Sequence, residues 1–309
     1  MSRRDFLKAS CLTMAGSGVL GVNRCFAIEP FNRGGSPNLA LSLAAYSFRD
    51  YFKDANHKRD TATDPAKRID LFQFIDFCAE HGCRGTELTS YYFPANVDAG
   101  FLLKVKRHAF LRGVAISGTA VGNTFTVPAG PKRDQEIANV KHWIDHAAIM
   151  GAPHIRIFAG EAPSGTSRDQ AKALCIAAIE ECCEYAGSKG IFLGLENHGG
   201  IVAEADQVLE IVRAVKSPWL GINLDTGNFH TDDIYGDLAK CAPYAVNVQV
   251  KTEISRRGQK KEPTDLSRVI KLLRDASYQG YVALEYEAAE DPWKAVPEVL
   301  KRLKPLLAG

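Results

Sequence analysis

The feature that most constrains the fold of this chain is an alternation, repeated eight times, of a short apolar run with a longer amphipathic segment. Short apolar runs bounded by turn residues are typical of buried strands, and amphipathic segments between them are typical of helices that cover a sheet. The predicted strands span residues 39–47, 85–90, 114–121, 154–159, 191–197, 221–226, 245–251 and 281–287. The predicted helices span residues 66–81, 97–112, 132–150, 168–189, 203–215, 233–241, 264–276 and 291–306.

Strands that alternate with helices predict a parallel sheet with right-handed crossovers. Eight such units in about 270 residues fit a closed (β/α)8 barrel, or TIM barrel, of the α/β class. The alternative is an open doubly wound sheet, which usually has a glycine-rich phosphate loop after its first strand. Residues 46–50 follow the first predicted strand and read YSFRD, which is no such loop. We therefore predict one barrel domain over residues 39–309.

The first 27 residues are predicted to be a signal peptide rather than part of the barrel. Residues 2–8 read SRRDFLK, an apolar segment follows over residues 9–22, and residues 25–27 offer a small-x-small cleavage site. This arrangement resembles a twin-arginine export signal, and the alternative is a basic N-terminal arm. The resemblance implies the twin-arginine export machinery as a partner and a periplasmic destination. Residues 28–38 are predicted to form a linker or N-terminal arm.

Composition and charge exclude some classes of protein. The apolar signal segment is too short to span a membrane comfortably. We also expect no transmembrane segment in the mature chain. Removing residues 1–27 takes away four basic residues and one acidic residue, so 38 basic and 36 acidic residues become 34 and 35, a formal charge of −1. A nearly neutral chain lacks the electrostatic footprint of a nucleic-acid-binding protein. The oligomeric state stays open.

Six cysteines lie outside the predicted signal. None has the paired spacing of a zinc site, so we interpret them as small buried hydrophobic residues, with one disulfide allowed by an oxidising destination. They are Cys78, Cys83, Cys175, Cys182, Cys183 and Cys241.

Three carboxylates end predicted strands on one side of the barrel. Glu196, Asp225 and Glu285 end the fifth, sixth and eighth strands, and Gln249 lies in the seventh. The active site of a TIM barrel lies at this end of the strands. Three carboxylates brought together would raise each other's pKa, and a divalent cation such as Mn²⁺ or Mg²⁺ would remove that cost. The alternative is that they are ordinary helix caps or surface groups.

Four strand ends carry a resemblance to a known family. The segments LGLENHGG, GINLDTGNF, VNVQVK and VALEYE resemble the strand ends of the xylose isomerase-like, or sugar phosphate isomerase/epimerase, superfamily, over residues 39–306. The resemblance implies that Glu196, Asp225 and Glu285 bind one divalent metal ion (Mn, Mg or Zn). It also implies that Glu196 and Glu285 are the proton-transfer pair. The implied partner is a small sugar or sugar derivative.

The chain departs from the family pattern at two positions. The family commonly has HxH in the seventh strand, where this chain has Asn247-Val248-Gln249. Gln249 offers a neutral carbonyl oxygen as the fourth metal ligand, which is weaker than imidazole. The family also often has histidine three residues after the aspartate, where this chain has Asn228.

Five further residues are predicted to contact the substrate: His198, Lys251, Arg156, Glu87 and Asn228. Lys251 is expected either to neutralise a carboxylate or to hold an enediolate oxygen, and the alternative is a salt bridge to Glu253 or Glu285. Arg156 lies among apolar neighbours and needs a partner, which is Glu87, Glu196 or the substrate.

The sequence predicts a metal-dependent sugar isomerase or epimerase that works by proton transfer through an enediolate. Two alternatives remain. One is an exported lyase or hydratase that acts on keto-sugars or ketoglycosides, and the other is a non-catalytic sugar-binding relative.

Overall fold

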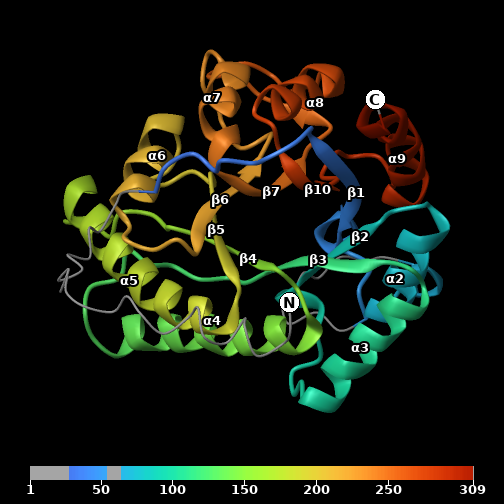
Figure 1. Cartoon of the computed structure of the whole chain (residues 1–309), viewed down its shortest axis with the longest axis horizontal. Helices are drawn as coiled ribbons and strands as arrows, with labels where there is room; N and C mark the ends of the chain where they lie inside the picture. The colour runs from blue at the N-terminus through green and yellow to red at the C-terminus, as the bar shows by residue number, and fades with distance from the viewer. Residues whose placement is uncertain (1–27, 54–63, 309) are drawn as a thin grey trace, which may run out of the picture.

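The computed structural model describes residues 28–53 and 64–308, and within them eight parallel strands form a closed barrel (Figure 1). Parallel pairing between the first and last strands, from Asn38 with Gln279 to Leu43 with Leu284, closes the barrel. The predicted (β/α)8 fold is therefore confirmed. The strands, in chain order, are β1 (Asn38–Ala44), β2 (Gly85–Thr89), β3 (Ala115–Ala120), β4 (His154–Ile157), β5 (Phe192–Glu196), β6 (Leu220–Asp225), β7 (Ala245–Val250) and β10 (Gln279–Leu284).

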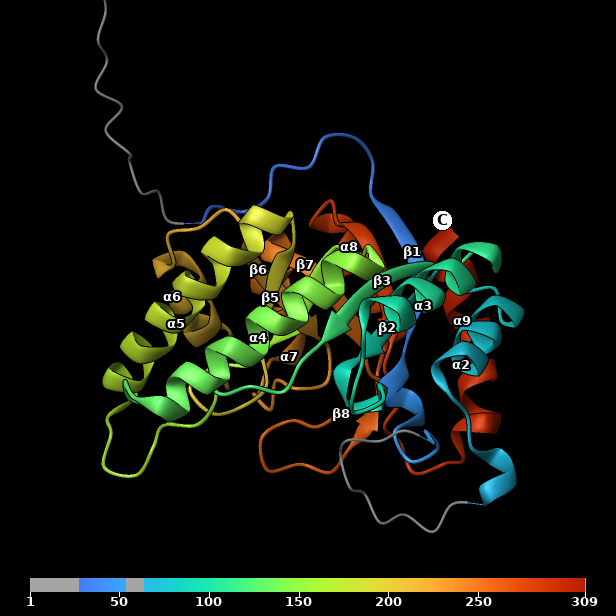
Figure 2. The same cartoon turned by 90° about the horizontal axis from the view of Figure 1, so that it is seen from below.

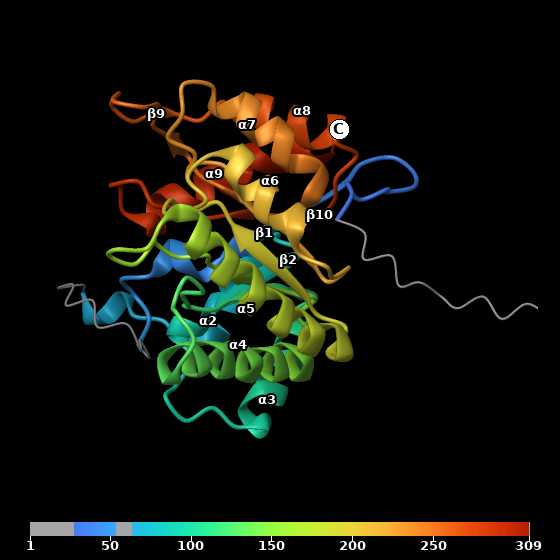
Figure 3. The ribbon, with the colours of Figure 1, turned by 90° about the vertical axis from the view of Figure 1, so that its left-hand side faces the viewer.

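Helices follow the strands and surround the barrel (Figure 3). No helix in the described part of the chain is both long enough and apolar enough to cross a membrane. The helices are α2 (Leu71–Glu80), α3 (Ala99–Leu111), α4 (Pro131–Met150), α5 (Arg168–Lys189), α6 (Ala205–Ala214), α7 (Ile234–Cys241), α8 (Leu266–Asp275) and α9 (Pro292–Ala308).

Local chemistry fixes where several helices begin and end. At the start of α5, the Ser167 side chain accepts a hydrogen bond from the Gln170 amide, and the Gln170 side chain accepts one from the Ser167 amide. This capping box satisfies two amide groups that have no partner inside the helix. The helix ends at Gly190, whose φ of 71° lies in the left-handed region that glycine adopts at little cost.

The segment before β1 packs against the amino-terminal end of the barrel and is a fixed arm rather than a loose linker. Figure 2 shows it running along the barrel before it enters β1. The Phe31 amide donates to the Pro243 carbonyl oxygen at 3.0 Å, and the Phe31 ring lies 6.0 Å from the ring of Phe192. The predicted signal, residues 1–27, lies outside the described residues.

One element was absent from the sequence prediction. Two short antiparallel strands, β8 (Glu253–Ile254) and β9 (Glu262–Pro263), form a ribbon after β7, and the basic stretch 256–262 makes most of its turn. The six cysteines in the described residues are buried and free, so none of them forms the disulfide that an oxidising destination would allow.

Candidate active site

A buried network of polar side chains fills the barrel below its carboxyl-terminal mouth. Glu87, in the middle of β2, accepts hydrogen bonds from the amide groups of Asn247 and Gln249, both at 2.6 Å. The Gln249 carbonyl oxygen accepts from Asn223 at 2.6 Å, and Asn223 in turn accepts from Asn247 at 2.8 Å. Burial, aided by the charge of Glu285 and opposed by the hydrogen bonds from Gln249 and Asn247, raises the pKa of Glu87 to about 7. This network forms the floor of the site.

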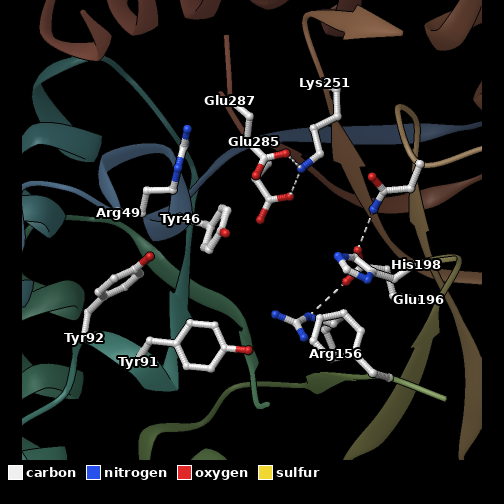
Figure 4. Close-up of a pocket in the computed structure, with 12 residues that line it drawn as sticks. Tyr46, Arg49, Tyr91, Tyr92, Arg156, Glu196, His198, Lys251, Glu285 and Glu287 are labelled. Carbon is white, nitrogen blue, oxygen red and sulfur yellow. Dashed lines mark hydrogen bonds and ion pairs between the residues drawn. The ribbon is translucent and has the colours of Figure 1, made fainter. Parts of the chain in front are cut away.

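Above the floor lies a cavity of about 260 Å³ (Figure 4). Six of the predicted site residues line it: Arg156, Glu196, His198, Asn228, Lys251 and Glu285. Asp225, Gln249 and Glu87 do not line it. Of the two glutamates that the sequence allowed as partners of Arg156, Glu87 lies mid-strand and bonds the floor amides instead.

Glu196 is held by an ion pair and a hydrogen bond on one side of the cavity. Its side chain is 4% exposed, and its Oε2 lies 3.0 Å from Arg156 Nε. Asn228 donates to the other carboxylate oxygen at 2.8 Å. Burial raises the pKa of Glu196, and the Arg156 charge opposes this only in part. Arg156 therefore has Glu196 as its partner, one of the three possibilities that the sequence left open.

Lys251 pairs with three carboxylates on the other side of the cavity, and two of them, Glu285 and Glu287, are drawn beside it in Figure 4. Its Nζ is 2.5 Å from Glu285 Oε2, 3.2 Å from Asp225 Oδ2, and also pairs with Glu287. Burial by itself lowers the pKa of Lys251, but the three carboxylates outweigh it and hold the pKa well above its ordinary value. Burial also raises the pKa of Asp225, which is fully buried.

The four predicted metal ligands are not arranged as a cage for a cation. The Glu196 carboxylate forms an ion pair with Arg156 and accepts a hydrogen bond from Asn228. The carboxylates of Asp225 and Glu285 form ion pairs with Lys251. Within residues 28–53 and 64–308, no group of three or more histidine, cysteine, aspartate or glutamate side chains could hold a metal ion.

Gln249, the fourth predicted ligand, does not direct its oxygen toward the other three. That oxygen bonds Asn223, whereas the amide nitrogen lies 2.6 Å from Glu87 Oε1 and 3.4 Å from Glu285 Oε1. With these side chains paired to one another and to Lys251 and Arg156, the donor set does not fit a divalent ion.

The two glycines after His198 have a structural reason. Gly199 and Gly200 have φ angles of 67° and 57°, which side chains other than glycine rarely adopt. A Cβ atom at Gly200 would lie 2.5 Å from the Gly160 carbonyl oxygen. The turn places the exposed His198 at the rim, with its ring 4.6 Å from that of Phe158.

Sequence reasoning missed three residues of the site. Glu287 pairs with Lys251, and its position two residues after Glu285 was the available signal. Arg49 lines the cavity and donates to the Tyr286 carbonyl oxygen at 3.1 Å. Asn197 joins the ends of β5 and β6 through two hydrogen bonds of 2.9 Å to the Asp225 backbone.

Three tyrosines line the cavity on the side away from Lys251 and Glu196, and Arg49 lies on the same side (Figure 4). Tyr46, Tyr91 and Tyr92 come from the loops after β1 and β2, and they line the cavity together with Phe158.

Comparison with known proteins gives a family match. A family model described as "Xylose isomerase-like TIM barrel" matches residues 75–303. A curated relative from Xenopus laevis, named "Putative hydroxypyruvate isomerase", is 25% identical over 252 residues, which cover 74% of this chain and 89% of the relative.

Two solved structures share the fold. A D-psicose 3-epimerase, solved in the presence of D-fructose, is 14% identical with a TM-score of 0.71, and the match covers 87% of this chain and all of that chain. A xylose isomerase-like TIM barrel protein from Mycobacterium smegmatis, solved in complex with magnesium, is 18% identical with a TM-score of 0.65. That match covers 87% of this chain and 96% of the other.

Proposed function

The chain belongs to the xylose isomerase-like TIM barrel family, and we propose that it is an isomerase or epimerase. Its reaction transfers a carbon-bound proton next to the carbonyl group of a small sugar or sugar-like hydroxycarbonyl compound. The observation that carries the proposal is that Glu196 and Glu285 line one cavity. They come from β5 and from the end of β10, which are separated in the barrel by β6 and β7. Two carboxylates thus reach the same small molecule from different sides.

The proton transfer needs one base and one acid. The base removes the proton beside the carbonyl group, and the electron pair moves onto the carbonyl oxygen to give an enediolate. The acid then returns a proton to carbon. Return to the opposite face of the same carbon gives an epimer. Return to the former carbonyl carbon, with a hydroxyl proton passing between the two oxygens, gives an isomer.

We assign the base to Glu285 and the acid to Glu196 in one direction of the reaction. Lys251 at 2.5 Å and the Gln249 amide at 3.4 Å hold Glu285 in place. Burial raises the pKa of Glu196, which helps that group carry a proton near neutral pH. The roles exchange when the reaction runs in reverse.

Two cations of the cavity support charge development on oxygen. Arg156 and Lys251 line the space into which both glutamates point. An enediolate oxygen between them would be stabilised more strongly than the neutral carbonyl oxygen of the substrate.

Dependence on a divalent metal stays a prediction from the sequence. The magnesium complex of a structural relative supports it. The contacts of Lys251 and Gln249 oppose it. We therefore assign no step of the proton transfer to a metal ion.

Export remains a second proposal, which rests on the twin arginines Arg3 and Arg4. If residues 1–27 are a twin-arginine signal, replacement of both arginines by lysine retains the protein in the cytoplasm. Unchanged fractionation to the periplasm would contradict the proposal.

The test of the enzymatic proposal is an NMR screen in D₂O with short ketoses, aldoses and hydroxy-keto acids. The last class is included because a curated relative is named for hydroxypyruvate. We expect one compound to give an isomer that carries deuterium on carbon. Loss of either carboxylate should slow the reaction by about 100-fold or more.

The matched control for Glu196→Gln and Glu285→Gln is Glu184→Gln, an exposed change on α5. Release of water or an alcohol would instead assign the lyase alternative. Binding without exchange would assign the sugar-binding alternative.

A further inference from the structure

We propose that the Lys251 ammonium group takes the place of a divalent metal ion in this active site. The inference rests on the proposed function and specifies which cation that function uses. It is argued from the contacts of Lys251, the orientation of Gln249 and the balance of charge.

The ammonium group is surrounded by oxygen ligands of the kind a divalent ion needs. Asp225, Glu285 and Glu287 contact Nζ from the end of β6 and from the segment after β10. The ammonium donates hydrogen bonds to Glu285 and Glu287, and Asp225 is its ion-pair partner at 3.2 Å. The side chain of Lys251 is 9% exposed. A cation of the protein itself is therefore coordinated where three carboxylates converge.

One of the three partners is exchangeable. The side chains of Asp225 and Glu285 are 0% and 8% exposed, whereas that of Glu287 is 35% exposed. A substrate oxygen entering the cavity can displace Glu287 and accept its hydrogen bond from Nζ. The ammonium would then hold the substrate as a metal does, while Asp225 and Glu285 keep it in position.

The orientation of Gln249 also disfavours a bound metal. Its amide group donates toward Glu285, a carboxylate that a metal would need as a ligand. Glu87 carries two carboxylate oxygens that accept from Gln249 and Asn247. Turning the Gln249 amide would set its nitrogen against the Asn223 amide nitrogen and leave Glu87 facing an oxygen. The floor network therefore keeps an N–H group directed at Glu285 Oε1, which lies 3.4 Å away.

The charge of the buried Asp225 carboxylate also favours Lys251 as the cation of the site. Asp225 Oδ2 is buried and accepts no hydrogen bond from the described part of the chain, because the Gly227 amide bonds Oδ1, so the charge at that oxygen is balanced by the Lys251 ammonium 3.2 Å away. A buried carboxylate needs a paired cation. A divalent ion in this position would have to expel the Lys251 ammonium from the same oxygens.

The experiment measures binding of Mn²⁺ alone, without substrate. Purified protein is dialysed against EDTA and then against Mn²⁺, and bound metal is counted by elemental analysis, with the shift in Tm as a second readout. The wild type should hold no stoichiometric Mn²⁺ and show no shift in Tm. One ion per wild-type chain would overturn the proposal.

Two variants test whether Lys251 is the cause. Lys251→Met, and the same change combined with Gln249→His, should bind Mn²⁺ at least about tenfold more tightly than the wild type, because the carboxylates lose their resident cation. Lys271→Met, an exposed change on α8, is the matched control and should leave metal binding unchanged. If neither Lys251 variant gains affinity, the ammonium does not occupy the metal position and the proposal fails.

Lys251→Gln replaces Lys251→Met if circular dichroism shows that the methionine variant is unfolded. No substrate enters these measurements. A failure of the proposed isomerase function, which appears as absent proton exchange, is therefore distinguishable from a failure of this inference.

Discussion

The side chains of Arg156 and Glu196 are both nearly buried. Either charge, buried without the other, would lower the stability of the fold. Their side chains are 5% and 4% exposed, and their ion pair measures 3.0 Å. Removing one partner of such a pair typically costs about 3–5 kcal/mol, because the other charge stays buried alone. The pair is therefore a fixed feature of the cavity wall rather than a flexible surface contact.

His154 shows how burial at the other end of the barrel affects stability. It is fully buried inside the barrel, and a Cβ at Gly118 would collide with its ring. Burial lowers the pKa of His154 from 6.5 to about 4. His154 in the unfolded chain is protonated below about pH 6.5, whereas in the folded chain it is protonated only below about pH 4. The free energy of unfolding therefore falls as the pH drops through this range.

We predict that His154→Gln flattens the acid dependence of stability. The wild type should lose up to about 3 kcal/mol between pH 7 and pH 4 through this residue alone, at 1.36 kcal/mol per pKa unit. Urea unfolding at both pH values measures the loss, with His142→Gln on exposed α4 surface as control. An equal loss in His154→Gln and wild type would rule out this role.

At the scale of elements, the turn after β5 positions the rim of the site. Gly199 and Gly200 have similar positive φ angles, yet only Gly200 would place a Cβ against a neighbouring backbone atom, the Gly160 oxygen at 2.5 Å. A Cβ at Gly199 would meet nothing within 4 Å. Substitution of Gly199 therefore introduces backbone strain alone, whereas substitution of Gly200 introduces both strain and a steric collision.

We predict that Gly199→Ala costs about 1 kcal/mol in free energy of unfolding, from backbone strain alone. Gly200→Ala should cost clearly more and should also lower kcat/KM, because the collision moves His198. Chemical unfolding and substrate kinetics of the two variants provide the comparison. Equal effects of both changes would contradict the structural account of this turn.

Elements were predictable where local signals set them. Glycine residues in left-handed conformations and the Ser167 capping box end and begin helices, and such signals are visible in the sequence. The β8–β9 ribbon has strands of two residues each, too short to produce a periodic pattern. Its pairing depends on the neighbouring loops rather than on its own sequence.

At the scale of the whole molecule, barrel closure decides which side chains meet. Strand alternation correctly predicted that Glu196 and Glu285 face a common cavity, because the side-chain period of two sets the face. Strand alternation does not determine how deep in the barrel a side chain lies. Glu87 has the inward parity but lies mid-strand, next to a register shift between Thr86 and Glu87, and therefore joins the floor.

The partners of the charged residues also depended on three-dimensional packing. Asp225 ends β6, Lys251 directly follows the adjacent strand β7, and Glu287 reaches the same ammonium from the segment after β10. The sequence supplied the carboxylates and the lysine, but only the barrel places the ammonium between them. This is why a metal site was the natural prediction from the sequence and an internal ion pair is the observed arrangement.

The central claim is that Glu196 and Glu285 form a proton-transfer pair, and the most direct test is proton exchange in single variants. With the substrate identified, each epimer or isomer is incubated in D₂O with Glu196→Gln or Glu285→Gln, and deuterium on carbon is followed by NMR. The account predicts that each variant loses interconversion. Each variant should still exchange the proton of the one isomer that its remaining carboxylate reaches. Full interconversion by both variants would contradict the account.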